Sequence, residues 1–184
     1  MKANDQLGQF NGPAEVRLVR TLPGPIERVW EYLTDDEKRA RWLAGGVMEP
    51  RKGGKVQFKF RHKDISPDEV PPPEFKELHE VGHSMTCVVT RWEPPRVLAF
   101  TFGSDGESEA TFELTAQGKD VQLVLTHRAT GGDLPEMSGY GTGWHMHVSL
   151  LFALLADKPR PPFWGEFVRL KKDYEKARLA AQGS

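Results

Sequence analysis

The chain has 184 residues, which is long enough for one domain to bury a full core without disulfides or a structural metal. Its 25 Lys and Arg residues nearly balance its 26 Asp and Glu residues, so neither nucleic acid nor an anionic membrane is favoured as a partner. The one cysteine, Cys87, cannot form an internal disulfide, and its apolar neighbours predict an inert buried thiol. The chain starts without the hydrophobic run of a signal peptide, so we expect a cytoplasmic protein.

The N-terminal quarter of the chain predicts an arm, one strand and two short helices. Residues 1–13 are polar and rich in turn formers, which indicates a flexible arm. Residues 14–20 alternate apolar and charged side chains, as is typical of a half-buried strand. Residues 34–37 resemble a capping box, with Thr34 as the cap of a second helix that ends near Leu43. The first helix follows Pro25, with apolar residues at helical spacing: Ile26, Val29, Trp30 and Leu33.

Short segments of alternating polarity then predict an antiparallel sheet. A hairpin turn at 51–54 joins strands at 47–50 and 55–60. The short connections between the later strands indicate that neighbours in sequence pair as a meander. Large apolar side chains fall on one face of this sheet, which therefore needs a cover on one side only. These later strands are expected at 84–92, 96–102, 108–116 and 121–129.

Residues 62–79 interrupt the strand pattern with charged residues and four prolines. This segment is longer than most loops of compact domains. It is either a lid over a site or a solvated insertion, of which the second is the commoner case.

The segment 143–155 has no charge and no proline, and its apolar residues recur at helical spacing all round the axis. Such a helix must be buried, and thirteen residues are too few to span a bilayer. We expect it to lie across the concave face of the sheet, where it covers either a packed core or a pocket. The preceding glycine-rich run 139–143 lacks the lysine of a phosphate loop and is interpreted as a sharp turn into the helix.

After a proline-rich break, residues 163 to about 180 predict a final helix with a narrow apolar stripe. This helix is expected to dock either on the domain or on a second subunit. An exposed patch of Phe163, Trp164 and Phe167 would favour a homodimer through the C-terminal helix. The chain is thus divided into an arm (1–13), a domain (14–157) with an insertion (62–79), and a C-terminal extension helix (158–184).

The predicted order of elements is an α+β fold: a curved antiparallel sheet of six to seven strands around a long helix, with two short helices after the first strand. This order and five local motifs resemble the helix-grip fold of the START-like (SRPBCC) superfamily. Within it the chain is most similar to the bacterial branch of Aha-type activators of the heat-shock protein 90 ATPase, over residues 14 to about 156. The motifs are Pro25–Trp30, Gly53–Phe58, Glu93–Phe102, Leu125-Thr126-His127 and Gly143-Trp144-x-x-His147.

The resemblance implies a cavity between sheet and long helix that holds an apolar small molecule in many relatives. Other relatives are cyclases or hydrolases, and some act by binding a chaperone. The candidate ligand-binding residues are the large side chains expected on the inner faces of sheet and helices, with two histidines as polar anchors. They are Trp30, Trp42, Phe58, Phe60, Met85, Phe100, Phe102, Phe112, His127, Trp144, His147 and Leu151.

The histidines do not predict a metal site. His145 and His147 lie two apart on a helix and point to nearly opposite sides, and His79 and His83 flank a poor helix former. His127 falls on the apolar face of its strand by parity. A lone buried histidine is most often a satisfied core group, but His127 and His147 are the candidates to orient a ligand carbonyl or hydroxyl, or to act as acid or base.

Three functional hypotheses remain open at this point. The first is a non-enzymatic START-like domain that binds a hydrophobic small molecule, without cofactor or metal. The second is a cyclase or hydrolase that uses the same pocket through its histidines. The third is a domain that interacts with a chaperone through its outer surface.

Overall fold

The computed structural model describes residues 3–103 and 105–182. The strands are β1 (Gln9–Phe10), β2 (Glu15–Pro23), β3 (Lys55–Phe60), β4 (His83–Glu93), β5 (Val97–Phe102), β6 (Ser108–Gln117) and β7 (Asp120–Ala129). The α-helices are α1 (Ile26–Thr34), α2 (Asp36–Ala40), α3 (Lys76–Glu80), α4 (Met137–Leu155) and α5 (Trp164–Gln182). Three short 3₁₀ helices are η1 (Ala3–Asp5), η2 (His62–Asp64) and η3 (Pro73–Phe75).

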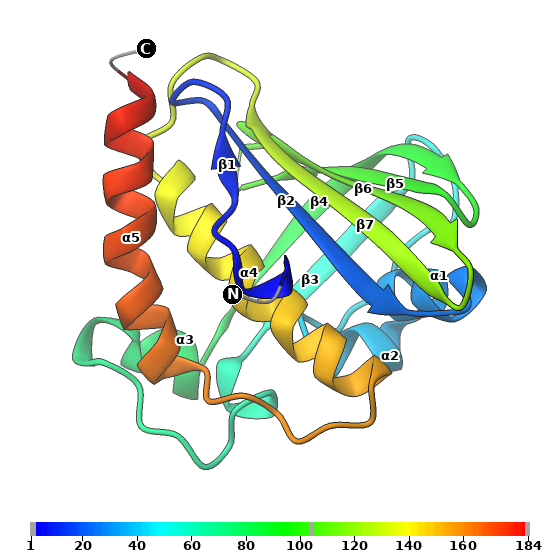
Figure 1. The fold of residues 1–184 in the computed structure, drawn as a ribbon, viewed down its shortest axis with the longest axis horizontal. Helices are drawn as coiled ribbons and strands as arrows, with labels where there is room; N and C mark the ends of the chain where they lie inside the picture. The colour runs from blue at the N-terminus through cyan, green and yellow to red at the C-terminus, as the bar shows by residue number, and fades with distance from the viewer. Residues whose placement is uncertain (1–2, 104, 183–184) are drawn as a thin grey trace.

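The strands form one antiparallel sheet in the order β1-β2-β7-β6-β5-β4-β3. Strands β4 to β7 are the predicted meander, β3 pairs with β4, and β2 pairs with β7, the last strand in the sequence. The chain therefore crosses from one edge of the sheet to the other between β2 and β3, and α1 and α2 lie in that crossing (Figure 1). The expected α+β helix-grip fold is confirmed.

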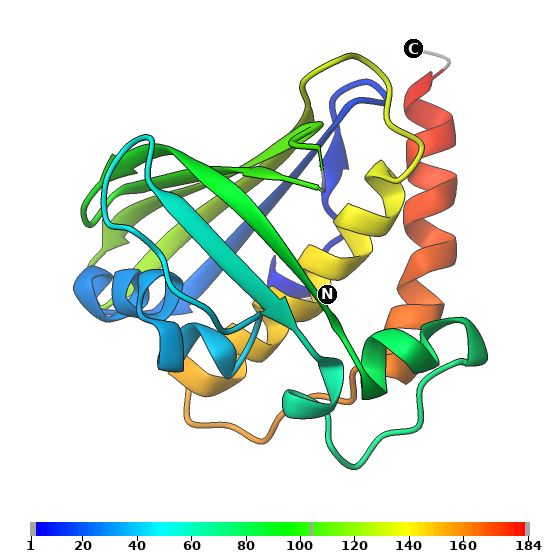
Figure 2. The same cartoon turned by 180° about the vertical axis from the view of Figure 1, so that it is seen from behind.

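Alternate residues of β3 and β7 are buried on the concave face of the sheet, which α4 crosses (Figures 1 and 2). Phe58, Phe100 and Phe112 are each at most 2% exposed. The rings of Phe112 and Phe102 contact the indole of Trp144 on α4, at centroid distances of 5.4 and 5.5 Å. The large rings of the sheet thus turn toward the long helix, as the alternation of polarity predicts.

Helix α4 begins six residues before the predicted start, because the glycine-rich run is helical and not a turn. The reason is a close approach of α4 to α5. A Cβ at Gly141 would stand 2.7 Å from the Tyr174 ring and 3.3 Å from the Val16 side chain. Gly141 is therefore required by packing between the helices, which periodicity along one helix does not reveal.

Two local predictions near the first helices are also wrong. The cap of α2 is Asp35, whose carboxylate accepts the Lys38 N–H at 2.9 Å. The Thr34 hydroxyl instead donates to the Trp30 carbonyl, because Thr34 is still in the last turn of α1. Residues 47–50 form no named strand and touch β3 only through an isolated bridge at Met48.

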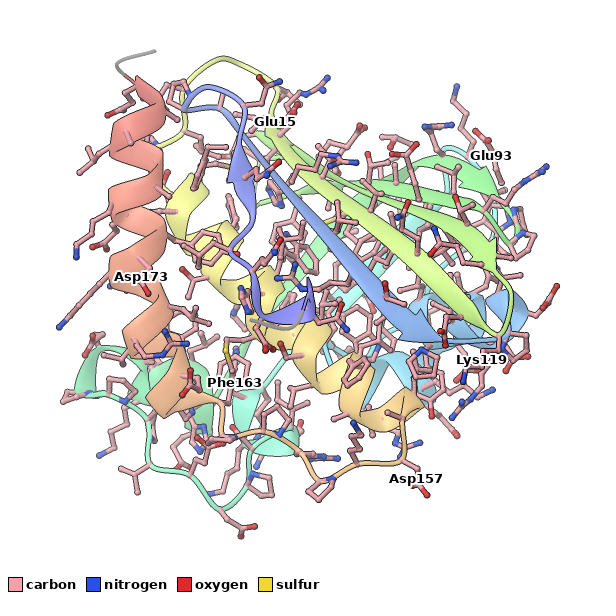
Figure 3. All side chains as sticks on the ribbon, viewed as in Figure 1. Glu15, Glu93, Lys119, Asp157, Phe163 and Asp173 are labelled. Carbon is pink, nitrogen blue, oxygen red and sulfur yellow. The ribbon has the colours of Figure 1, made fainter. Side chains whose placement is uncertain are left out.

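The insertion 62–79 is folded onto the start of α5 (Figure 3). The Glu69 carboxylate accepts the backbone N–H groups of Phe163 at 2.7 Å and Trp164 at 2.8 Å, so it occupies the positive end of the α5 dipole. Arg160 donates to the Ile65 carbonyl at 3.1 Å, and the Trp164 indole donates to His79 at 3.0 Å. The insertion and α5 therefore hold each other in place.

The predicted exposed patch on the last helix is wrong for the same reason. Phe163 is 0% and Trp164 2% exposed, because the insertion and α4 cover them. Helix α5 docks on its own domain, where Tyr174 accepts the Gly8 N–H at 2.7 Å. A homodimer through α5 stays a prediction, but the exposed apolar patch that suggested it is absent from the described residues.

Gly141 and Gly143 give a matched test of this packing, because a Cβ at Gly143 would meet no atom within 4 Å. We expect Gly141→Ala to lower the free energy of unfolding by about 1–3 kcal/mol through overpacking against Tyr174. Gly143→Ala should raise it by about 0.5–1 kcal/mol, because alanine is the better helix former. Urea unfolding of both variants measures these changes; equal effects of the same sign would contradict the packing described.

Candidate functional site

A cavity of about 470 Å³ lies between the first half of α4, the ends of β3 to β5 and the start of α5. Its volume is in the range that holds a small metabolite. Five of the predicted ligand-binding residues line it: Phe60, Met85, Phe102, Trp144 and His147. The other seven do not border it and lie elsewhere in the domain, mostly in the core: Trp30, Trp42, Phe58, Phe100, Phe112, His127 and Leu151.

Two glycines of α4 leave the space open on the helix side. Gly139 and Gly143 are one helical turn apart and both line the cavity. A Cβ at either position would meet no atom within 4 Å. The cavity is thus open beside Gly139 and Gly143, and a larger residue at either position would meet no neighbouring side chain with its Cβ.

His147 supplies a defined polar group to this cavity. Its Nδ1 lies 2.6 Å from the Trp42 carbonyl, and a carbonyl can only accept, so Nδ1 carries the proton. The Nε2 atom of the neutral ring is then an acceptor. Burial lowers the pKa of His147 to about 4, which keeps the ring neutral at neutral pH.

His62 from the insertion lies beside His147, with 5.4 Å between the ring centroids. Its Nδ1 is buried and has no hydrogen-bond partner among the described residues. Burial and the neighbouring histidines lower its pKa to about 3. His83 also borders the cavity and stacks on Phe60 at 5.1 Å. The polar part of the wall therefore combines three imidazoles, of His62, His83 and His147, with the side chains of Ser84, Glu107 and Tyr140.

His127 has a different environment from the one that a ligand anchor needs. It is 0% exposed, and Tyr140 stacks on its ring at 4.2 Å. The Trp144 indole donates to its Nδ1 at 2.7 Å, so Nε2–H donates to the Ser108 hydroxyl at 2.8 Å. Both ring nitrogens have protein partners, and His127 joins β7 to α4. Of the two candidate acid–base residues, only His147 borders the cavity.

Comparison with known proteins assigns this fold to a family. The family model described as "Activator of Hsp90 ATPase homolog 1-like protein" matches residues 23–156. The chain belongs to this family.

Solved structures agree with this assignment. The NMR structure of a Bordetella parapertussis protein is 38% identical, with a TM-score of 0.78 over 94% of this chain and 90% of that chain. The crystal structure of CalU16 from Micromonospora echinospora is 21% identical, with a TM-score of 0.65 over 97% of each chain. The solution structure of the Aha1 dimer from Colwellia psychrerythraea is 15% identical, with a TM-score of 0.58 over 77% of this chain and 95% of that chain. The last two comparisons show the fold alone. A search of curated proteins finds no match.

Several cavity residues of this Aha-type chain were missed by sequence reasoning. They come from the insertion, the loop after α2 and the C-terminal helix: Leu43, His62, Leu78, Phe163 and Phe167. No period in the sequence connects these segments, so only the interrupted pattern at 62–79 was a signal. That segment is folded and borders the cavity through His62 and Leu78.

Within the part of the chain that the structure describes, no group of three or more metal-ligating side chains occurs. Nor does any helix of that part have the length and apolar character needed to cross a membrane. Cys87 is buried, and desolvation raises the pKa of its thiol to about 11, as expected of an unreactive cysteine.

Four buried histidines predict a dependence of stability on pH. Burial lowers the pKa of His62 and His127 to about 3 and that of His145 and His147 to about 4, from 6.5. As pH falls below about 6.5, the unfolded chain binds protons that the folded chain does not. The free energy of unfolding should therefore decrease between about pH 6.5 and 4, by up to about 1.4 kcal/mol per pH unit for each histidine.

Urea unfolding across this window measures the slope. The slope of the free energy of unfolding against pH reports how many protons the chain takes up on unfolding. The variant His127→Asn removes one of the four groups, so it should lower this number by about one. A flat profile would show that these rings are not held neutral in the folded state.

Proposed function

We propose that this chain binds an apolar small molecule with a hydroxyl group in the cavity between the sheet and α4. The observation that carries the proposal is the cavity itself, of about 470 Å³, with aromatic walls and a helix side left open by two glycines. Binding sites for small molecules are mostly apolar cavities with a few placed polar groups. The START-like resemblance supports the same kind of ligand.

His147 defines the polar end of the ligand. Because Nδ1–H donates to the Trp42 carbonyl, Nε2 can only accept a hydrogen bond. A hydroxyl or N–H group is therefore favoured over a carbonyl, which has no proton to donate. This refines the sequence-based hypothesis, which left a carbonyl and a hydroxyl open.

The variant Gly143→Leu tests the binding site. Its side chain would enter open space on the cavity side of α4, where the Cβ meets no atom within 4 Å. The probe is 2-naphthol, whose rings match the aromatic walls. We expect Gly143→Leu to weaken its binding at least tenfold, measured by isothermal titration calorimetry or ligand-observed NMR.

The matched control is Gly165→Leu. Gly165 is also helical and also has open space at its Cβ, but it does not line the cavity. The second probe is naphthalene, which lacks the hydroxyl; His147→Leu should remove most of the preference for 2-naphthol over naphthalene, a factor of roughly two to ten for one hydrogen bond. Equal loss of binding in Gly143→Leu and Gly165→Leu would defeat the proposal.

A second candidate function follows from the family description, namely the regulation of a chaperone ATPase by direct contact. That role would use the outer surface and not the cavity. Capture of this chain by a chaperone middle domain, unchanged in Gly143→Leu, would favour it over ligand binding as the primary function.

A further inference from the structure

A second hollow, of about 1200 Å³, lies on another side of α4. Its walls are the N-terminal segment, β2, the second half of α4 and the start of α5, which lie side by side in Figure 1. It shares no lining residue with the first cavity, because the two are bordered by different faces of α4. The proposed function makes no use of it.

Arg20 of β2 is the charged group at the base of this hollow. It is 4% exposed, and among the described residues no ion pair joins its guanidinium to a carboxylate. Its donors reach the carbonyls of Val19 at 2.9 Å and Gln6 at 2.8 Å, and Nε has no partner in this part of the chain. A buried charge without a counterion is costly, so the position favours an anion.

His145 of α4 adds a neutral donor beside Arg20. Its Nδ1 lies 3.3 Å from the Arg20 guanidinium and 3.0 Å from the Tyr174 hydroxyl. A guanidinium only donates, so Nδ1 must accept, and the ring proton is on Nε2. Nε2–H is then the hydrogen-bond donor that His145 can offer to a molecule in the hollow.

Apolar side chains make up most of the remaining wall: Leu22, Met146, Val148, Phe152 and Leu170. Of the acidic groups there, Glu166 and Asp173 are paired with Arg169. Burial lowers the pKa of Arg20; Asp5 opposes this shift electrostatically but forms no ion pair with Arg20 among the described residues. Lys158 lies over the Phe152 ring, 5.3 Å from its centroid, and adds a second cation at the rim. The hollow thus combines an apolar surface with the buried guanidinium of Arg20.

We propose that this hollow binds an amphiphilic monocarboxylate, with its apolar body along α4 and its carboxylate against Arg20 and Nε2–H of His145. The proposal is independent of the ligand of the first cavity. It assigns the unpaired guanidinium a counterion that the described residues do not supply.

The test compares decanoate with decanol by isothermal titration calorimetry at neutral pH. The two probes share an apolar chain and differ in charge, so we expect decanoate to bind at least tenfold more tightly. Arg20→Gln should remove this preference while decanol binding is kept. Because a change at a buried arginine can unfold the chain, a second variant is needed.

Ser149→Leu is that variant, since Ser149 lines the hollow and is only half-buried. It should weaken the binding of both probes at least tenfold, whereas Gly143→Leu, which fills the first cavity, should leave decanoate binding unchanged. Equal affinity of the wild-type chain for decanoate and decanol would overturn the proposal. So would decanoate binding that is blocked by Gly143→Leu and not by Ser149→Leu, because decanoate would then occupy the first cavity. The proposed function is tested separately, by the binding of 2-naphthol.

Discussion

The burial of α4 on nearly every side is the constraint on which the rest of the structure depends. Its centre has no charged residue, and side chains all round its axis are removed from water. One layer of sheet covers only one face of a helix, so the other faces need other elements. The insertion and α5 provide that cover, and the Glu69 carboxylate at the start of α5 joins the two.

Helix α4 has no charged side chain that could fix its rotation about its own axis. Buried hydrogen bonds fix that rotation instead. Trp144 donates to His127 of β7, His145 bonds with Arg20 of β2 and Tyr174 of α5, and His147 donates to the Trp42 carbonyl after α2. Each bond joins α4 to a different element. A rotation of the helix would break all of them at once and leave buried polar groups unpaired, which is costly. The rotation in turn places Gly139 and Gly143 against the cavity.

The same contacts explain how much of this structure the sequence predicts. Alternating polarity has a direct physical cause in the half-buried sheet, and strands β2 to β7 lie within a few residues of their predicted bounds. The exceptions are residues 47–50, which form no named strand, and β1, which lies in the segment expected to be a flexible arm. Local signals fail where a distant contact decides the outcome. Position 141 requires glycine because the Tyr174 ring approaches it, and His62 and Phe163 line the cavity because the insertion meets α5. The aromatic and histidine candidates on the strands follow from the alternation of side chains along a strand. This alternation distinguishes the inner face of the sheet from the outer face, but it does not distinguish a ring packed in the core from a ring that borders a cavity.

The glycines of α4 separate these two cases. Each glycine within a helix costs about 0.5–1 kcal/mol relative to alanine. At Gly141 packing explains the glycine: a Cβ would approach the Tyr174 ring to 2.7 Å, so no larger residue fits. At Gly139 and Gly143 no atom lies within 4 Å of the Cβ position, as is also true of the exposed Gly165 on α5, so packing of the chain gives no reason for glycine at these positions. If the space were only imperfect core, a methyl group at either position would stabilise the fold at no steric cost. The cost of glycine at Gly139 and Gly143 would be offset if a ligand occupied the space beside them, as proposed above.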